Sequence, residues 1–286
     1  MISRKAYAKI NLSLDVLGKY PNGYHQVKMV MQTVDLYDEL SFEEIDSANG
    51  DIVLTSDSEG LELDDNNLIV KAAKLLKDRF PSGKGVKVGL VKNIPIAAGM
   101  AGGSTDAAAT LHGINELFSL GLSDEELCNL GVTIGADIPY CIMGGTMLAE
   151  GIGEKLSKIK SVPELKLVIA KPEKGVSTKF VYENLDVLDN PPHPDTDGMI
   201  AAIENSDIEK ITSKLGNILE CVTIPALPEV ATIKQILSDN GAKGVLMSGS
   251  GPTVFAIFDD DEKADKAAKI LKEDSPAKFV CVTRTV

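Results

Sequence analysis

The 286-residue sequence lacks the patterns that mark several classes of protein. Its cysteines are far apart and form no C-x-x-C pair, so neither a zinc knuckle nor a disulfide framework is expected; they are Cys128, Cys141, Cys221 and Cys281. No run approaches the ~20 apolar residues that a membrane span needs. Residues 1–16 also lack the uninterrupted apolar stretch of a signal peptide. We therefore expect a cytoplasmic protein without a membrane partner.

Basic residues are scarce as well. The chain has 29 Lys and Arg against 42 Asp and Glu, which gives a formal net charge of −13. Broad binding to nucleic acid needs a basic surface that releases counterions, so a nucleic-acid partner is not expected. Because the chain as a whole is acidic, any anionic ligand must meet a local basic site.

Hydrophobic residues make up 44% of the chain, which is enough for a packed core. The length of the chain favours two domains.

One stretch is rich in glycine but lacks the lysine that a phosphate-binding loop would lead us to expect. "NIPIAAGMAGGSTDAAA", residues 93–109, runs directly into a helical pattern. It fits neither the P-loop G-x-x-x-x-G-K-[ST] nor the dinucleotide fingerprint G-x-G-x-x-G. The carboxylate of Asp106 would repel phosphate unless its side chain points away. If the loop binds a nucleotide, the positive charge must come from elsewhere in the chain.

The hydrophobic pattern predicts an alternation of strands and helices. Along "AYAKINLSLDVLG" apolar and polar residues alternate, which predicts a strand with one face buried and Lys9, Asn11, Ser13 and Asp15 on the other. Further strands are predicted at 27–36, 51–55, 86–91, 165–170 and 279–284. Helices are predicted at 67–80, from about 104, and at 262–273, and Ser123 and Glu126 form a capping-box pattern.

The middle of the chain is interrupted by prolines, from Pro163 to Pro194, and "NPPHPDTDG" has the least regular pattern. We therefore place a domain boundary between residues 152 and 163. The predicted domains are 1–157 and 158–286.

Several motifs have ordinary explanations when each is taken singly. Asp137 in "GADIPY" fits a helix N-cap, followed by a proline in the first turn. "MSGSGPTVF", residues 247–255, fits a tight turn. Lys9 and Asn11 would ordinarily be solvated, and Tyr24 and His25 would be a loop aromatic and a surface imidazole.

Together these segments resemble the GHMP family of small-molecule kinases. The similarity lies in the order and spacing of "AYAKINLSLDVLGKYPNGYHQVKMVMQTVDLYDEL", "IPIAAGMAGGSTDAA", "GADIPYCIMGG" and "MSGSGPTVFAIF", and it spans nearly the whole chain. The resemblance implies an α/β (α+β) protein with the two-domain GHMP kinase architecture. The N-terminal domain would resemble domain 2 of ribosomal protein S5, and the C-terminal α+β domain would be ferredoxin-like. ATP and substrate would lie in the cleft between them.

The resemblance also implies where the chemistry lies. Lys9, from a distant strand, would supply the charge that the loop lacks and orient Asp137, the catalytic base. ATP would be bound by loop residues Pro95, Ala97, Ala98, Gly99, Met100, Ala101, Gly102, Gly103, Ser104 and Thr105. Mg²⁺ would bridge the phosphates. Its protein ligands stay open, with Ser104 or Thr105 as candidates.

The block A-K-I-N followed by G-Y-H resembles the branch of the family whose small-molecule substrate carries a cytidine diphosphate group. Tyr24 and His25 would then hold the cytosine, and Asn11 the sugar-alcohol end. Thr178 and Tyr182 are further candidates for binding the substrate. Ala101 departs from the family pattern, in which many members have glycine, and its methyl group restricts the backbone there.

Two alternatives remain on the sequence alone. The chain could be another GHMP enzyme, such as a homoserine or mevalonate-type kinase or a diphosphomevalonate decarboxylase, although the G-Y-H block argues against this. It could also be a nucleotide-binding module without catalysis, although the presence of both Lys9 and Asp137 argues against that. The pattern leaves open whether the protein is a monomer or a homodimer.

Overall fold

The computed structural model describes all residues, 1–286, and they group into two compact units. Unit 1 comprises Met1–Ala8, Leu36–Ile96 and Ala101–Gly144, and unit 2 comprises Lys9–Asp35, Ala97–Met100 and Gly145–Val286. The first two strands are long enough to contribute residues to both units; they are β1 (Ile2–Lys19) and β2 (His25–Asp46). Because the units follow contacts in space, they do not correspond to a single cut in the chain. The boundary near residue 157 stays a prediction.

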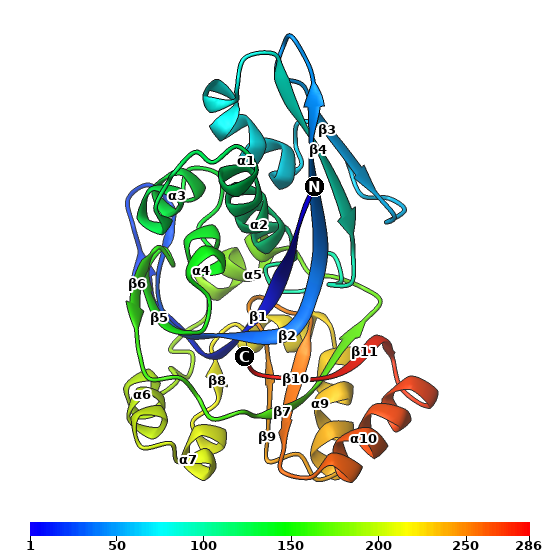
Figure 1. Ribbon diagram of the computed structural model, residues 1–286. Coiled ribbons are helices and arrows are strands. Elements are labelled where there is room, and N and C mark those ends of the chain that lie inside the picture. The colour runs from blue at the N-terminus through cyan, green and yellow to red at the C-terminus, as the bar shows by residue number, and fades with distance from the viewer. The chain divides into compact units, whose positions relative to one another are not determined.

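Unit 1 is a sheet with helices packed against it (Figure 1). In the sheet, β4 (Lys84–Val91) pairs antiparallel with residues 39–46 of β2 and parallel with β3 (Ile52–Ser56). The helices are α1 (Leu68–Leu76) with a 3₁₀ turn at Lys77–Arg79, α2 (Gly102–Leu117), α3 (Asp124–Gly131) and α4 (Ile138–Met143). The predicted strands at 51–55 and 86–91 and the helices after residues 67 and 104 are confirmed within a few residues.

Helix α2 lies very close to the sheet of unit 1. A Cβ atom on Gly113 would come within 2.4 Å of the Phe42 ring, so only glycine permits this approach. Phe42 is fully buried and shares a core with Leu76 of α1 and Leu111 of α2. The start of α3 carries the predicted capping box, in which Ser123 and Glu126 each bond the other's backbone. Apolar packing and local caps therefore fix the helices that precede and follow the glycine loop.

Unit 2 contains the other part of β1 and β2. There β5 (Thr146–Gly151) pairs antiparallel with residues 27–32 of β2, and β6 (Lys155–Lys158) pairs with β5. The short β8 (Gly216–Asn217) pairs parallel with β1. These three strands were not predicted from the sequence. They are short, and β6 and β8 lack an alternating apolar pattern.

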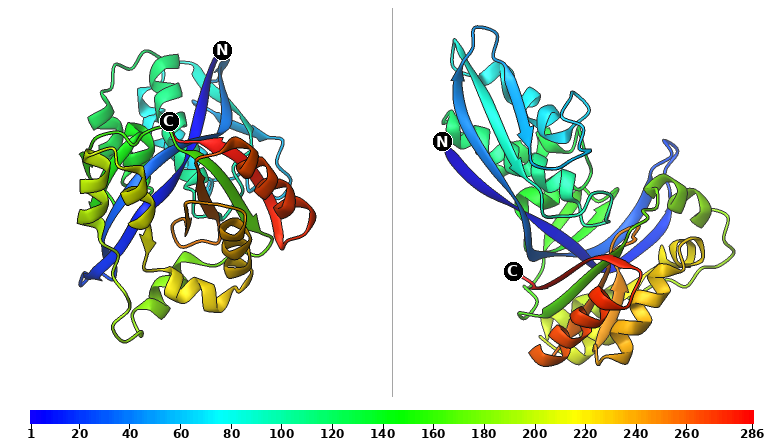
Figure 2. Two further views of the ribbon diagram at one scale, coloured as in Figure 1. Left: turned by 90° about the horizontal axis from the view of Figure 1, so that it is seen from below. Right: turned by 90° about the vertical axis from the view of Figure 1, so that its right-hand side faces the viewer.

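The second sheet of unit 2 has the strand order β11-β7-β10-β9, with every pair antiparallel. Its strands are β7 (Lys166–Pro172), β9 (Gly244–Met247), β10 (Val254–Phe258) and β11 (Ala277–Arg284). Numbered along the chain this order is fourth, first, third, second, the ferredoxin-like order expected. Helices α9 (Glu229–Asp239) and α10 (Asp261–Glu273) pack on this sheet (Figure 2). The remaining helices are α5 (Thr178–Leu185), α6 (Thr196–Glu204), α7 (Ile208–Ser213) and α8 (Glu220–Ala226).

The prediction that β1 is buried on one face is wrong, because both faces are buried from Ala8 to Val16. The polar face forms a row of internal hydrogen bonds. Ser13 Oγ lies 2.7 Å from Thr196 Oγ1, and Asp15 Oδ1 lies 2.7 Å from His193 Nδ1. A polar residue is tolerated inside a protein when it has such a partner. The sequence pattern could not show these partners, since they lie about 180 residues away.

None of the helices is long and apolar enough to cross a membrane.

Candidate active site

The glycine loop enters α2 through three residues in the left-handed backbone region. Ala97, Gly99 and Ala101 have φ angles of 51°, 71° and 57°. Ala101 is the N-cap of α2, and no side chain caps the helix. The first N–H groups of α2 therefore lack a side-chain acceptor. Such amides, at the positive end of a helix, are typical of a phosphate-binding site.

The second glycine cluster packs directly against the first within unit 2. A Cβ on Gly99 would come within 2.3 Å of the Ser248 carbonyl oxygen, so the two backbones touch. The Ser248 hydroxyl donates to the Gly99 carbonyl at 3.0 Å. The segment 247–255 is therefore more than the isolated tight turn that its own sequence suggests. It supports residues 97–100 of the glycine loop.

Lys9 and Asn11 lie beside this pair of loops. Taken singly, each would be expected to be a solvated polar residue. Lys9 is only 4% exposed and its ammonium donates to Asn11 Oδ1 at 2.8 Å. The same oxygen accepts from the backbone N–H of Gly249 at 3.1 Å. The backbone N–H of Lys9 donates to the Met100 carbonyl at 3.2 Å. The structure thus brings together Lys9, Asn11 and both glycine clusters, although they lie far apart in the sequence.

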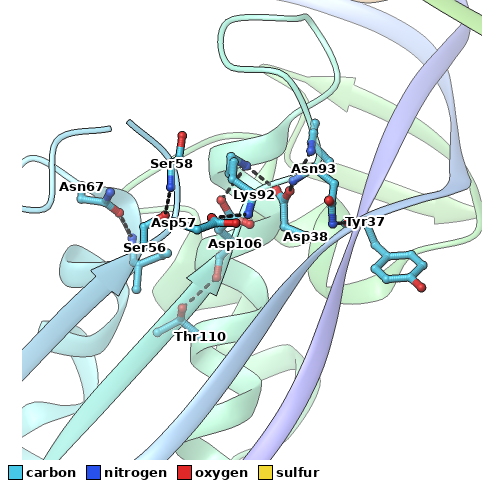
Figure 3. A network of polar contacts seen from close by, with 12 residues as sticks. Tyr37, Asp38, Ser56, Asp57, Ser58, Asn67, Lys92, Asn93, Asp106 and Thr110 are labelled. Atoms are coloured by element: carbon cyan, nitrogen blue, oxygen red, sulfur yellow. Dashed lines mark hydrogen bonds and ion pairs between the residues drawn. The ribbon is translucent and has the colours of Figure 1, made fainter. Parts of the chain in front are cut away.

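A second buried lysine lies at the start of α2, and sequence reasoning missed it. The Lys92 ammonium bonds both Asp38 and Asp106 (Figure 3). A Cβ on Gly102 would come within 3.1 Å of this ammonium. Asp38, fully buried, also accepts from the N–H groups of Asn93 and Ile94 at 2.6 and 2.7 Å. No motif marks Lys92. It stands immediately before the quoted glycine stretch, which is the one signal that could have found it.

Asp106 is turned into this cluster, which resolves the concern that its charge would repel a phosphate. Its Oδ2 accepts from Lys92 at 2.9 Å, whereas its Oδ1 is buried without a hydrogen-bond partner. Burial raises the pKa of Asp106 to about 7, opposed by the Lys92 charge and reinforced by the Asp38 charge. The side chain is therefore paired internally and is neutral over part of the physiological pH range.

Asp137 is at the N-cap position of α4, as its sequence context suggests, but its side chain makes no capping bond. Pro139 lies in the first turn of that short helix and fixes the backbone there. Asp137 is half-buried. A capping role therefore does not account for the carboxylate at this position.

The residues expected to bind cytosine, Tyr24 and His25, lie where β2 begins. The His25 and Tyr182 rings have centroids 4.7 Å apart at 36°, and Tyr24 is 58% exposed. Thr178, at the start of α5, lies 2.8 Å from the Ser250 hydroxyl in the second glycine cluster. The structure thus places His25 beside Tyr182 and connects Thr178 to the glycine loops. No group of three or more His, Cys, Asp or Glu side chains forms a metal cluster.

Comparison with known proteins identifies the family of the chain. Residues 67–145 match the family "GHMP kinases N terminal domain" and residues 199–277 match "GHMP kinases C terminal". A 4-diphosphocytidyl-2-C-methyl-D-erythritol kinase of Lachnoclostridium phytofermentans is 50% identical over 99% of this chain and 97% of its own length. The enzyme of that name from Caldicellulosiruptor saccharolyticus is 52% identical over 94% and 92%.

Solved structures show the same fold. A crystal structure of 4-(cytidine 5'-diphospho)-2C-methyl-D-erythritol kinase superposes with a TM-score of 0.83 at 29% identity, covering 100% of both chains. L. major mevalonate kinase superposes with a TM-score of 0.75 at 20% identity over 100% of this chain and 96% of its own. The chain therefore belongs to the GHMP kinases, a family of small-molecule kinases.

Proposed function

We propose that the protein transfers the γ-phosphoryl group of ATP to the 2-hydroxyl of 4-diphosphocytidyl-2-C-methyl-D-erythritol, in the non-mevalonate route to isoprenoid precursors. GHMP kinases use ATP as phosphate donor. The observation that supports this choice of substrate is the 50% identity, over nearly the full length of both chains, to a relative named as this kinase. Mevalonate kinases share the fold at 20% identity or less, which supports only the fold.

The proposed phosphate site consists of the loop from Pro95 to Thr105. Uncapped N–H groups at the start of α2 would bind the phosphates, because they combine unused donors with the positive end of the helix dipole. The glycine at 99 lets the loop pack on the Ser248 carbonyl and so holds the loop backbone in place. Such preorganised donors stabilise the charge that spreads over a transferring phosphoryl group.

Mg²⁺ fits this site as a metal held mainly by phosphates and water. The chain offers no group of three or more His, Cys, Asp or Glu side chains that could hold a metal ion, and Mg²⁺ in kinases usually keeps several waters and needs few protein ligands. Of the two candidate hydroxyls, Thr105 is 3% exposed within the packed face of α2, whereas Ser104 is half-buried. Ser104 is therefore the better candidate ligand. The ion would neutralise phosphate charge when bound.

The proposed catalytic pair is Lys9 and Asp137. Asp137 would accept the proton of the attacking hydroxyl, because it is a half-buried carboxylate at the position that the family resemblance implies for the catalytic base. Lys9, buried and held by Asn11, would stabilise the negative charge that develops during transfer. Asn11 is proposed to contact the sugar alcohol through its Nδ2, whose acceptor within the chain is the weak thioether of Met29 at 3.2 Å. Tyr24, His25, Thr178 and Tyr182 complete the proposed substrate site.

A direct assay tests this function. ADP release is measured with ATP and a panel of alcohols: 4-diphosphocytidyl-2-C-methyl-D-erythritol, 2-C-methyl-D-erythritol 4-phosphate, mevalonate and homoserine. We expect turnover with the first alone, and the product should carry its new phosphate on the 2-hydroxyl by phosphorus NMR. Equal turnover of the acceptor without its cytidyl group, or preference for mevalonate or homoserine, would overturn the proposal.

A further inference from the structure

The imidazole of His25 is held on two sides by one helix. Tyr182 and Asp186 lie four residues apart on and at the end of α5, so they face the same direction. Tyr182 packs its ring against the imidazole, and Asp186 Oδ1 lies 2.7 Å from His25 Nε2. The imidazole is 11% exposed. Both its plane and the environment of one nitrogen are therefore fixed.

The carboxylate of Asp186 is held by a second residue. Lys19, at the end of β1, donates to Asp186 Oδ2 at 2.6 Å. The hydrogen bonds from Lys19 and then from His25 hold the pKa of Asp186 below its usual range. The intervening turn brings Lys19 and His25 to the same carboxylate, because the N–H of Tyr20 donates to the Tyr24 carbonyl at 2.7 Å. Asp186 is thus an ionised acceptor at neutral pH.

An ionised carboxylate can only accept hydrogen bonds, so the tautomer of a neutral His25 follows. Nε2 must carry the proton, and Nδ1 must carry the lone pair. No group of the chain makes a hydrogen bond to Nδ1, which leaves it available as an acceptor. The second nitrogen of a histidine is commonly set in this way by the partner of the first.

We propose that Asp186, held by Lys19, is a positioning residue that fixes the Nε2–H tautomer of His25, so that Nδ1 accepts a hydrogen bond from the amino group of cytosine and disfavours a uracil carbonyl. This inference rests on the proposed function, in which His25 contacts the base. Uracil would present a second acceptor to the Nδ1 lone pair, leaving both without a donor. Discrimination of one base by a hydrogen bond of this kind is about 10-fold to 100-fold.

The test compares kcat/KM for the cytidine substrate and its uridine analogue in the wild type and in Asp186→Asn. In that variant Lys19 should keep the amide oxygen, so the amide NH₂ turns to His25 and favours the opposite tautomer. We expect a cytidine preference of at least about 10-fold in the wild type, reduced about 10-fold in the variant. The loss should appear in KM for the cytidine substrate, with kcat and the KM for ATP unchanged, since the contact is remote from the chemistry.

Asp197→Asn is the matched control. Asp197 also binds a lysine, Lys28, at 2.6 Å in the same unit, but no imidazole contacts it. This variant should keep the base preference of the wild type. If Asp197→Asn lowers the preference as much as Asp186→Asn, or if neither does, the proposed role of Asp186 is wrong. Melting temperatures of both variants establish that they are folded.

Nitrogen NMR of the imidazoles separates this inference from the proposed function. The chain has only 3 histidines, and His25→Gln identifies the signal. We expect a protonated Nε2 and an unprotonated Nδ1 in the wild type, and the reverse in Asp186→Asn. A protonated Nδ1 in the wild type would overturn the inference even if the cytidine substrate is used. The expected tautomer without any turnover of the cytidine substrate would instead overturn the proposed function.

Discussion

Lys92 Nζ lies 2.9 Å from Asp106 Oδ2, and the same ammonium bonds the fully buried Asp38. One cation therefore faces two carboxylates at the start of the helix that follows the glycine loop. Each side chain of this cluster is at most 6% exposed. A buried group of two acids and one base cannot be fully ionised without an excess negative charge, which is costly away from water. The cluster links β2 and the residue that follows β4 to α2, so its charge state affects the stability of unit 1.

The first prediction concerns pH. Burial raises the pKa of Asp106 to about 7 from its ordinary value of 3.8. Between these values the folded protein keeps a proton that the unfolded chain has released, so stability falls as pH rises from about 4 to about 7. The contribution to the slope is at most about 1.4 kcal/mol per pH unit. Asp106→Asn, which is neutral at every pH, should remove this fall.

Urea denaturation at pH 5 and pH 8 measures the effect. The free energy of unfolding should decrease less between these pH values in Asp106→Asn than in the wild type. The exposed Asp197 serves as a control, because its replacement by Asn should leave the pH dependence unchanged. A wild-type slope that persists in Asp106→Asn would show that other groups cause it.

The second prediction concerns Lys92, the cation of the cluster. Lys92→Met would leave Asp38 and Asp106 buried without their cation, and breaking a buried ion pair in this way costs about 3–5 kcal/mol. Lys87→Met is the matched change, because Lys87 lies on β4, which ends directly before Lys92, but is exposed. It should alter the free energy of unfolding by less than about 0.5 kcal/mol. Equal effects of the two changes in urea denaturation would contradict a structural role for the cluster.

The sequence predicted local features well where the cause is itself local. The capping box of Ser123 and Glu126 and the strand at β4 depend on neighbouring residues or on a regular alternation. The internal partners of β1 are different. Asp15 meets His193, and Asn11 meets Gly249, across more than 170 residues. An alternating pattern identifies a strand but does not show what covers its polar face.

The same distinction between local and distant causes decides which residues of the candidate site could be predicted. The glycine loop, Lys9 and Asp137 were predicted as site residues because together they resemble a family pattern, and members of a family share contacts between distant parts of the chain. Lys92 and Asp186 lie outside the segments that resemble the family, and Asp38 lies within the first of them but was not predicted to have a role. Each has its role only through partners brought near by the fold, such as Lys19 for Asp186. Whether the predicted site residues bind ATP and substrate stays a prediction.

The third prediction concerns the left-handed backbone at Ala101, whose φ is 57°. A residue with a Cβ costs about 1–2 kcal/mol in this region, whereas glycine does not. Glycine also loses more entropy on folding, by about 0.4–1 kcal/mol, so Ala101→Gly should leave stability unchanged or raise it slightly. Ala201→Gly is the control, since Ala201 is exposed within α6, and it should cost about 1 kcal/mol. A similar loss in both variants would show that Ala101 is not strained.

The last prediction concerns Asp137 as the proposed base. Asp137→Asn keeps the size of the side chain but cannot accept a proton, so kcat should fall by about 10²–10⁴-fold, the range of lost general-base catalysis. Stability should change little, because asparagine has nearly the shape of aspartate and Asp137 is only half-buried. Asp260→Asn is the matched change: Asp260 caps α10 through the backbone N–H of Lys263 at 2.9 Å, and asparagine caps as well as aspartate. It should leave both kcat and melting temperature unchanged.

Single-turnover kinetics with ATP and the cytidine substrate give the rate of the chemical step, and equilibrium binding of ATP to Asp137→Asn should match the wild type. If the rate of that step in Asp137→Asn is within a few-fold of the wild type, another group takes the proton and Asp137 is not the base.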